Sequence, residues 1–183
     1  HAGHFTRNLI RALLLNFTPD FSIIWRRGRG LHGVYRRIAR ASSVFAVLTD
    51  LAIMLLGGQL KRKEALNGHF SDLLSWIYLS FTVIRRYHAD GQIKEDAPFA
   101  NYAIDYSCYE IQKAIEGILI NLRMPGFTWV LKGLVLSWFR LNPIGKQIPH
   151  ALSSNIAQLI QSSSLQRDRF TNGIYLANDK GAN

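Results

Sequence analysis

Cysteine is nearly absent from this chain of 183 residues, which contains only Cys108. A single cysteine excludes an internal disulfide framework and is typical of proteins in a reducing compartment. A charge-free apolar run of about 18 residues is also missing, which argues against a transmembrane helix. The first residues, His1 to His4, lack the pattern of a signal peptide. The chain does not begin with methionine, and we expect it to be a fragment of a longer protein.

Acidic residues are scarce in the first third of the chain. Residues 1–63 hold 11 Lys/Arg and 2 Asp/Glu, whereas residues 64–183 hold 11 and 10, so most of the formal net charge of +10 belongs to the first third. The basic residues cluster at Arg26-Arg27-Gly28-Arg29, Arg36-Arg37, Arg40 and Lys61-Arg62-Lys63. Such a face would suit nucleic acid, anionic lipid or an acidic surface of a parent protein. A solvated or interdomain face would carry the same charges.

Hydrophobic residues are plentiful, at 48% of the chain, so the sequence can bury a core and is not disordered. They recur at three- and four-residue spacing, which is typical of amphipathic helices, and no clean alternation of a strand occurs. The predicted helices cover residues 5–17, 34–56, 61–87, 99–122 and 151–161. We therefore predict an all-α fold, an up-and-down helical bundle of about five to six helices. It forms a single helical domain over residues 1–183, with a polar, loop-like tail at 162–183.

A glycine-rich stretch, Gly28-Arg29-Gly30-Leu31-His32-Gly33, has the G-x-G-x-x-G form of a dinucleotide-binding turn. Asp50 follows at about the distance of a ribose-binding acid. A dinucleotide fold would also need a second strand at Val44–Asp50. That stretch continues into Leu51–Leu56 as one helix-like run, and no later βαβ pattern follows. The glycines are therefore interpreted as a loop.

No residue can be nominated as catalytic, cofactor-binding or metal-ligating. Only His1 and His4 have ligand-like spacing, and zinc requires four converging ligands. Cys108 has no histidine nearby in sequence to activate it, so a packed thiol is the better interpretation. The adjacent carboxylates Glu95-Asp96 point in different directions, as expected of charges at a helix start.

The most hydrophobic segment, 126–141, holds aromatic residues typical of a membrane interface. Its candidate membrane contacts are Phe127, Trp129, Lys132, Trp138 and Phe139. The aromatic rings would lie among lipid headgroups while the lysine extends its ammonium toward water. The segment is too short to span a bilayer. Burial in the core would explain the same pattern, and both interpretations stay open.

The clearest motif is Gly57-Gly58-Gln59-Leu60-Lys61-Arg62-Lys63-Glu64. It resembles the G-G-x-L-K-R-[KR]-E segment of the bacterial long-chain acyl-CoA dehydrogenases of fatty-acid β-oxidation. Downstream, Asp72 and Tyr78 fit that family's G-D-x-L-S-x-x-Y-L pattern, with Ser71 where glycine is more usual. Arg86-Tyr87, Asp90-Gly91 and residues 95–98 resemble its K-R-Y, D-x-G and x-D-x-P elements. The family-motif positions are Gly57, Gly58, Lys61, Arg62, Glu64, Asp72, Arg86 and Tyr87.

The resemblance implies an FAD-dependent parent enzyme that oxidises the Cα–Cβ bond of a long-chain acyl-CoA to a trans-2-enoyl-CoA. In that family a glutamate removes the α-proton while hydride passes to the flavin. The flavin domain and the glutamate lie upstream of the matched region, and Glu64 matches no catalytic position. The chain is similar in placement to the C-terminal helical extension of very-long-chain acyl-CoA dehydrogenase, which binds no FAD and is linked to membrane association.

The resemblance thus predicts a non-catalytic domain that is inactive alone. Its expected partners are its own catalytic core, a second copy in a homodimer, and an anionic membrane surface. The expected location is the bacterial cytoplasm, peripheral on the inner membrane. The alternative is a basic helical nucleic-acid-binding domain, suggested by the arginines of residues 26–40, whose affinity would fall steeply with salt.

Overall fold

The computed structural model describes Gly3, Arg7 and residues 31–122 and 128–174, and no strand occurs within these residues. The α-helices are α3 (Leu31–Leu56), α4 (Glu64–Ala89), α5 (Ala97–Asn121), α6 (Thr128–Leu141), α7 (His150–Gln161) and α8 (Leu165–Thr171). Two short 3-10 helices, η1 (Gly57–Arg62) and η2 (Lys94–Asp96), precede α4 and α5. The all-α prediction is confirmed.

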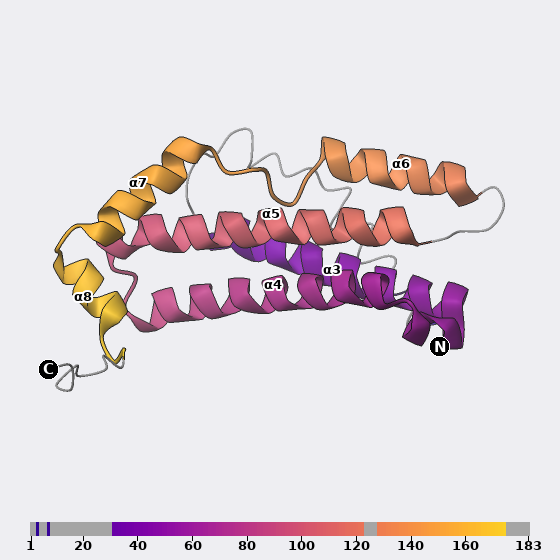
Figure 1. Cartoon of the computed structure of the whole chain (residues 1–183), viewed down its shortest axis with the longest axis horizontal. Helices are drawn as coiled ribbons and strands as arrows, with labels where there is room; N and C mark the ends of the chain where they lie inside the picture. Colours follow the sequence, from indigo (N-terminus) through magenta and orange to yellow (C-terminus); the bar gives the residue numbers. More distant parts are fainter. Residues whose placement is uncertain (1–2, 4–6, 8–30, 123–127, 175–183) are drawn as a thin grey trace, which may run out of the picture.

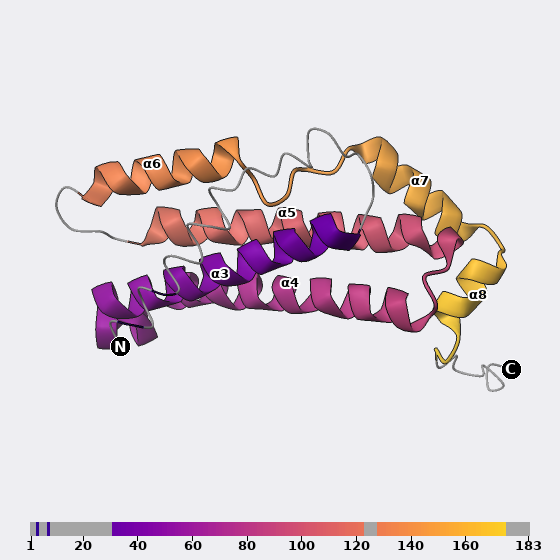
Figure 2. The same cartoon turned by 180° about the vertical axis from the view of Figure 1, so that it is seen from behind.

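The long helices run alternately up and down the long axis of the molecule (Figure 1). Helices α4 and α5 form an antiparallel hairpin and make the most extensive contact between two described elements. Helix α3 lies across both of them (Figure 2), whereas α6 lies along α5. The short helices α7 and α8 lie at the end where α5 begins. This arrangement is the predicted up-and-down bundle.

Helix α5 supplies a large share of the core because its apolar residues recur every three or four positions. Its fully buried side chains include Cys108, Ile111, Ile115 and Ile118, and α4 packs Leu66, Leu73, Ile77 and Ile84 against them. Each such aliphatic side chain contributes about 1.5–3 kcal/mol when it leaves water. The hairpin is therefore the element on which the other helices assemble.

Two glycines make the turns at the ends of α4. Gly57 has a φ of +50° where α3 ends, and Gly91 has a φ of +80° just after α4. Residues with a Cβ rarely adopt these angles, so glycine is favoured where the chain reverses. Both glycines belong to the motifs noted in the sequence, and the turns explain why those motifs contain glycine.

The predicted helix boundaries agree with the structure to within a few residues, apart from helix 5–17, which lies outside the described residues. Helix α3 begins before Gly33, and Val44–Asp50 lies inside it, so the strand that a dinucleotide fold needs is a helix. The tail predicted to be loop-like contains α8. The Ser164 hydroxyl caps that helix by accepting a hydrogen bond from the Arg167 N–H at 3.2 Å.

One stretch of the described residues, Gly33–Arg62, is long and apolar enough to cross a membrane by length and composition alone. A core helix of a soluble protein meets the same criterion. Here α3 packs against α4 and α5 as a member of the bundle, although only 28% of the apolar window is buried. Among the described side chains of α3, only Tyr35, Ile53 and Met54 are exposed, so most of the helix is at least partly covered.

Candidate functional site

The described residues contain no group of three or more His, Cys, Asp and Glu side chains that could hold a metal ion. Every buried side-chain N or O atom of the described part has a hydrogen-bond partner. His1 and His4 lie outside the described residues. Since no acid, base and nucleophile converge in the part of the chain that is described, the informative features are its surfaces and the contacts that hold them.

The family-motif positions do not gather into one site. Gly57, Gly58, Lys61 and Arg62 lie in η1, and Glu64 is the exposed first residue of α4. Asp72 lies on an exposed face of α4. Near the other end of α4, Arg86 forms an ion pair with Asp90 at 3.1 Å and the Tyr87 hydroxyl donates to the Gln92 carbonyl at 3.4 Å. These motifs therefore build the two turns that flank α4.

The candidate membrane contacts of segment 126–141 whose side chains are described, Lys132, Trp138 and Phe139, do not share one exposed face of α6. The Lys132 ammonium donates to the carbonyl oxygens of Ile120 at 2.6 Å and Leu122 at 3.3 Å, so it caps the end of α5. Phe139 is only 6% exposed and lies beneath the Arg40 guanidinium, whose carbon is 5.8 Å from the ring centroid. In this conformation the ring of Phe139 is not at the surface.

Trp138 is the described aromatic side chain of this set that reaches the surface. Phe127 lies outside the described residues, and Trp129 lies in the first turn of α6 with a side chain that is not described. Leu134, Trp138 and Leu141 are 64%, 37% and 83% exposed, and their spacing of four and three places them on one face. We call these three residues the outward face of α6.

The opposite side of α6 is fixed to α5 by a buried amide. Gln112 on α5 donates to the Phe139 carbonyl at 3.2 Å and accepts from the Ile144 N–H at 3.0 Å. Close by, a Cβ added to Gly145 would lie 2.2 Å from the carbonyl carbon of Cys108, so only glycine fits there. The segment after α6 is therefore pressed onto the backbone of α5, which leaves the outward face of α6 toward solvent.

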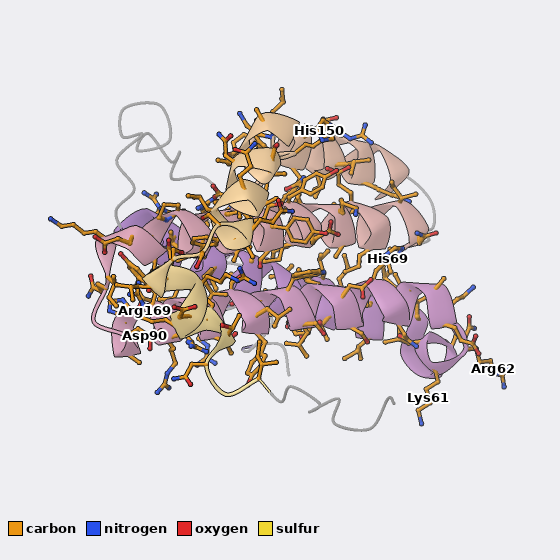
Figure 3. All side chains as sticks on the ribbon, turned by 60° about the vertical axis from the view of Figure 1, so that its left-hand side comes forward. Lys61, Arg62, His69, Asp90, His150 and Arg169 are labelled. Carbon is orange, nitrogen blue, oxygen red and sulfur yellow. The ribbon has the colours of Figure 1, made fainter. Side chains whose placement is uncertain are left out.

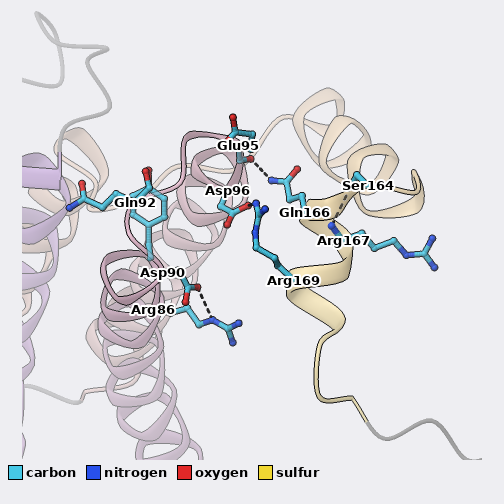
Figure 4. A network of polar contacts seen from close by, with 10 residues as sticks. Arg86, Asp90, Gln92, Glu95, Asp96, Ser164, Gln166, Arg167 and Arg169 are labelled. Carbon is cyan, nitrogen blue, oxygen red and sulfur yellow. Dashed lines mark hydrogen bonds and ion pairs between the residues drawn. The ribbon is translucent and has the colours of Figure 1, made fainter.

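The end of the bundle where α5 begins is held by ion pairs (Figure 4). Asp96, whose side chain is 8% exposed, accepts a hydrogen bond from Arg169 on α8 at 2.7 Å. This bond to Asp96 raises the pKa of Arg169 above its ordinary value. Gln166 donates to the Glu95 carbonyl, and Phe99 and Phe170 have ring centroids 5.2 Å apart. We call this region, which also contains the Arg86–Asp90 pair, the ion-paired end.

The described basic residues of the first third do not form one face. Arg37 makes an ion pair with Asp105 at 2.9 Å. Arg40 is buried, and it donates to the Asn142 carbonyl at 2.7 Å. Lys61 and Arg62 project from the far end of the bundle, opposite Asp90 and Arg169 (Figure 3). Because two arginines of the predicted basic face serve internal contacts, the nucleic-acid alternative loses part of its support.

Cys108 lies in the core of α5 and is fully buried. Burial raises the pKa of its thiol above the ordinary value of 9.0, although nearby Arg37 lowers it in part. A buried, protonated thiol is a poor nucleophile at neutral pH. The packed thiol that the sequence indicated is what the structure contains.

The described part of the chain is a helical bundle domain, and its informative features are the surfaces described above. The comparison with known families is more specific: the chain belongs to the bacterial-type acyl-CoA dehydrogenase C-terminal domain family, whose model matches residues 1–183. Membership implies FAD in the parent enzyme and an association of this domain with the catalytic core. No solved structure gives a significant match to the chain.

Three residues that hold these surfaces in place were not singled out by the sequence for that role. Asp96 was interpreted as a charge at a helix start, but its partner Arg169 lies 73 residues away. Gln112 and Gly145 belong to no motif, and the contacts that explain them come from other helices. The only local signal was the polar side chain of Gln112 within the apolar pattern of α5.

Proposed function

We propose that this chain is the non-catalytic C-terminal domain of an FAD-dependent long-chain acyl-CoA dehydrogenase, acting in the first oxidation step of fatty-acid β-oxidation. It supports assembly of the enzyme and brings it to the membrane surface, where long-chain acyl-CoA concentrates. The family match and the ordered sequence motifs support the enzyme class. The long-chain preference and the cytoplasmic location peripheral to the inner membrane rest on the resemblance.

The flavin belongs, in this proposal, to the upstream part of the parent enzyme. When bound there it accepts hydride from the substrate. Among the described residues, every buried polar side-chain atom already has a hydrogen-bond partner, so none is left unpaired for such a group. Glu64 is exposed at the start of α4. The contribution of this chain is therefore positional.

The observation that carries the membrane role is the outward face of α6. Leu134, Trp138 and Leu141 expose a contiguous apolar stripe on a helix whose opposite face is fixed to α5. Exposed apolar stripes of this kind mark protein or membrane interaction sites. Tryptophan favours the boundary between apolar and aqueous layers, because its ring is apolar and its N–H is polar.

A second apolar stripe, on α4, supports assembly with the catalytic core. Leu74, Tyr78 and Phe81 are exposed and lie on one face of the helix at spacings of four and three. Aromatic residues without neighbouring ion pairs are typical of the centre of a protein interface. We assign this face to the contact with the catalytic core of the same enzyme. Tyr78→Asp is therefore expected to weaken that contact and to lower the melting temperature of the full-length enzyme, without changing its binding to vesicles.

The membrane role is tested with the full-length protein and sedimenting lipid vesicles. The double variant Leu134→Ser with Trp138→Ser should lower the vesicle-bound fraction several-fold, since it removes apolar area that would enter the bilayer. Leu165→Ser, at a leucine of α8 that is 80% exposed, is the control. Unchanged binding of the double variant, or an equal loss in the control, would refute the role of the α6 face.

A further inference from the structure

We propose that the turn between α3 and α4 seats on an anionic lipid surface and makes the membrane contact selective for charge. This region comprises Ile53, Met54, Lys61, Arg62, Lys63 and Ile120, and we call it the basic end. The inference rests on the membrane role proposed above. It adds a second contact, separate from the outward face of α6, and a lipid class, since neutral bilayers would not satisfy the three cations.

The cations of the basic end are available for such a contact. Lys61, Arg62 and Lys63 are all exposed, and none has a side-chain hydrogen bond or ion pair with another described residue. Glu64, also exposed, is the acidic residue next to them in the chain. Three cations beside one carboxylate leave this end positively charged, whereas the ion pairs Arg86–Asp90 and Asp96–Arg169 lie at the opposite end.

Exposed apolar side chains lie at the same end of the bundle as the cations. Ile53 and Met54, in the last turn of α3 before η1, are 54% and 64% exposed, and Ile120 in the last turn of α5 is 53% exposed. A Cβ on Gly117 would meet the His69 ring at 2.6 Å, so the last turns of α5 lie beside the first turns of α4. The three apolar residues and the three cations therefore share one end of the molecule.

The sequence of this turn is unfavourable for folding alone. Lys63 is the N-cap residue of α4, and no side chain caps that helix start. Serine, threonine, aspartate or asparagine would accept a hydrogen bond there, and anions suit the positive end of the helix dipole. Three successive cations at this position oppose the dipole. An anionic partner would compensate these three cations and would explain why they occupy this position.

A lipid surface is the partner that suits both groups of side chains. Apolar residues enter the acyl boundary while Lys and Arg extend to the phosphates. A nucleic acid would use the cations but leave Ile53, Met54 and Ile120 in water. The basic end is also continuous with α6, because Lys132 in its first turns donates to the Ile120 carbonyl.

The test is flotation of the full-length protein with vesicles of phosphatidylcholine alone or with about one third phosphatidylglycerol. The variant Lys61→Gln with Arg62→Gln and Lys63→Gln should lose about tenfold or more in affinity for the anionic vesicles and little for neutral ones. Raised salt should reduce the difference. The matched control is Arg85→Gln with Lys94→Gln and Arg167→Gln, which removes the same charge from exposed residues elsewhere.

The triple variant is expected to melt at or above the temperature of the parent chain, because the cations oppose the α4 dipole, so lost binding would not reflect unfolding. Met54→Ser should also weaken binding to anionic vesicles. Equal losses in the control triple would overturn the inference. Unchanged binding of the basic-end variant, with binding lost when Trp138 is replaced, would overturn it while the proposed function stands.

Two further outcomes distinguish the basic-end inference from the membrane role on which it rests and from binding to nucleic acid. If the parent chain floats with neither vesicle, both the membrane role and this inference are wrong. If DNA or RNA is retained at low salt, and the triple variant loses this retention but not vesicle binding, the cations serve nucleic acid and the inference is wrong.

Discussion

The two ends of the bundle use charge in opposite ways. At the ion-paired end, Asp96 is nearly buried against Arg169, and Arg86 pairs with Asp90. At the basic end, three successive cations are exposed at the same end as exposed apolar side chains, and none of the three forms an ion pair with another described residue. Paired charge holds one short helix to another, whereas unpaired charge next to apolar surface indicates a partner outside the domain. The predictions below address this difference.

The largest effect is expected between the two ends, at Gly145. Gly145→Ala would place a Cβ 2.2 Å from the Cys108 carbonyl carbon and 2.3 Å from the Tyr109 nitrogen. The segment after α6 must then move off α5, at a cost of about 1–3 kcal/mol in the free energy of unfolding. Denaturant unfolding measures this cost, and hydrogen exchange should quicken in α7 and α8 but not in η1.

Gly133→Ala is the control for that variant, because nothing lies within 4 Å of its added Cβ in α6. It should be neutral or stabilising by up to about 1 kcal/mol. If the two alanines had the same effect, the close approach of Gly145 to α5 would not be what fixes α7 and α8.

A smaller, more local effect is expected at the ion-paired end. Arg169→Ala leaves the Asp96 carboxylate nearly buried without its partner, so α8 should detach from the start of α5. Amides of α8 are expected to exchange roughly tenfold faster while α4 and η1 keep their protection. Arg167→Ala, on the same helix, should leave exchange unchanged. Faster exchange across the whole bundle would show that the pair supports more than α8.

At the basic end a substitution should raise stability. Lys63→Asp supplies the missing N-cap of α4 and replaces a cation by an anion at the positive end of the dipole. The free energy of unfolding should rise by about 0.5–1 kcal/mol, measured by thermal unfolding. Lys146→Asp, in the segment after α6, lacks a helix start and should not stabilise. A destabilising Lys63→Asp would mean that the cation serves the fold itself.

Cys108 gives the smallest effect and reports on the whole core. Because burial raises its pKa, the folded chain keeps the thiol proton where the unfolded chain loses it. Its contribution to stability is present below about pH 9 and decreases as the pH rises further. Thermal stability should therefore decline slightly above pH 9, and Cys108→Ala should remove that decline. Alkylation at neutral pH should be slow in the Arg169 variant and faster in the Gly145 variant.

The sequence predicted the fold well because the apolar spacing of α4 and α5 is itself the cause of their packing. Residues such as Ile111 and Ile115 are buried for the reason that their periodicity indicates. The same reasoning identified segment 126–141 as apolar. It could not say which aromatic side chains of the segment are buried and which are exposed. Trp138 faces solvent and Phe139 is buried, and only the position of α5 and of Arg40 decides between two adjacent aromatic residues.

The surfaces were harder to predict because charge in a sequence does not show its partners. Arg37 and Arg40 belonged to the same basic cluster as Lys61, yet the two arginines are used inside the bundle. The helix α8 was missed because its seven residues are mainly polar, and its stability comes from contacts with Asp96 and Phe99. Long-range contacts of this kind leave no local pattern.

The order of contacts along the chain has a consequence for how the domain is made. The basic end and the α4–α5 hairpin join neighbouring helices, so they can form once the chain up to about residue 120 has left the ribosome. The Asp96–Arg169 pair, in contrast, joins residues that are 73 positions apart. The ion-paired end must therefore close last. A ribosome stalled before α8 would already display the cations of η1, so the lipid contact that we propose would not have to wait for the domain to be complete.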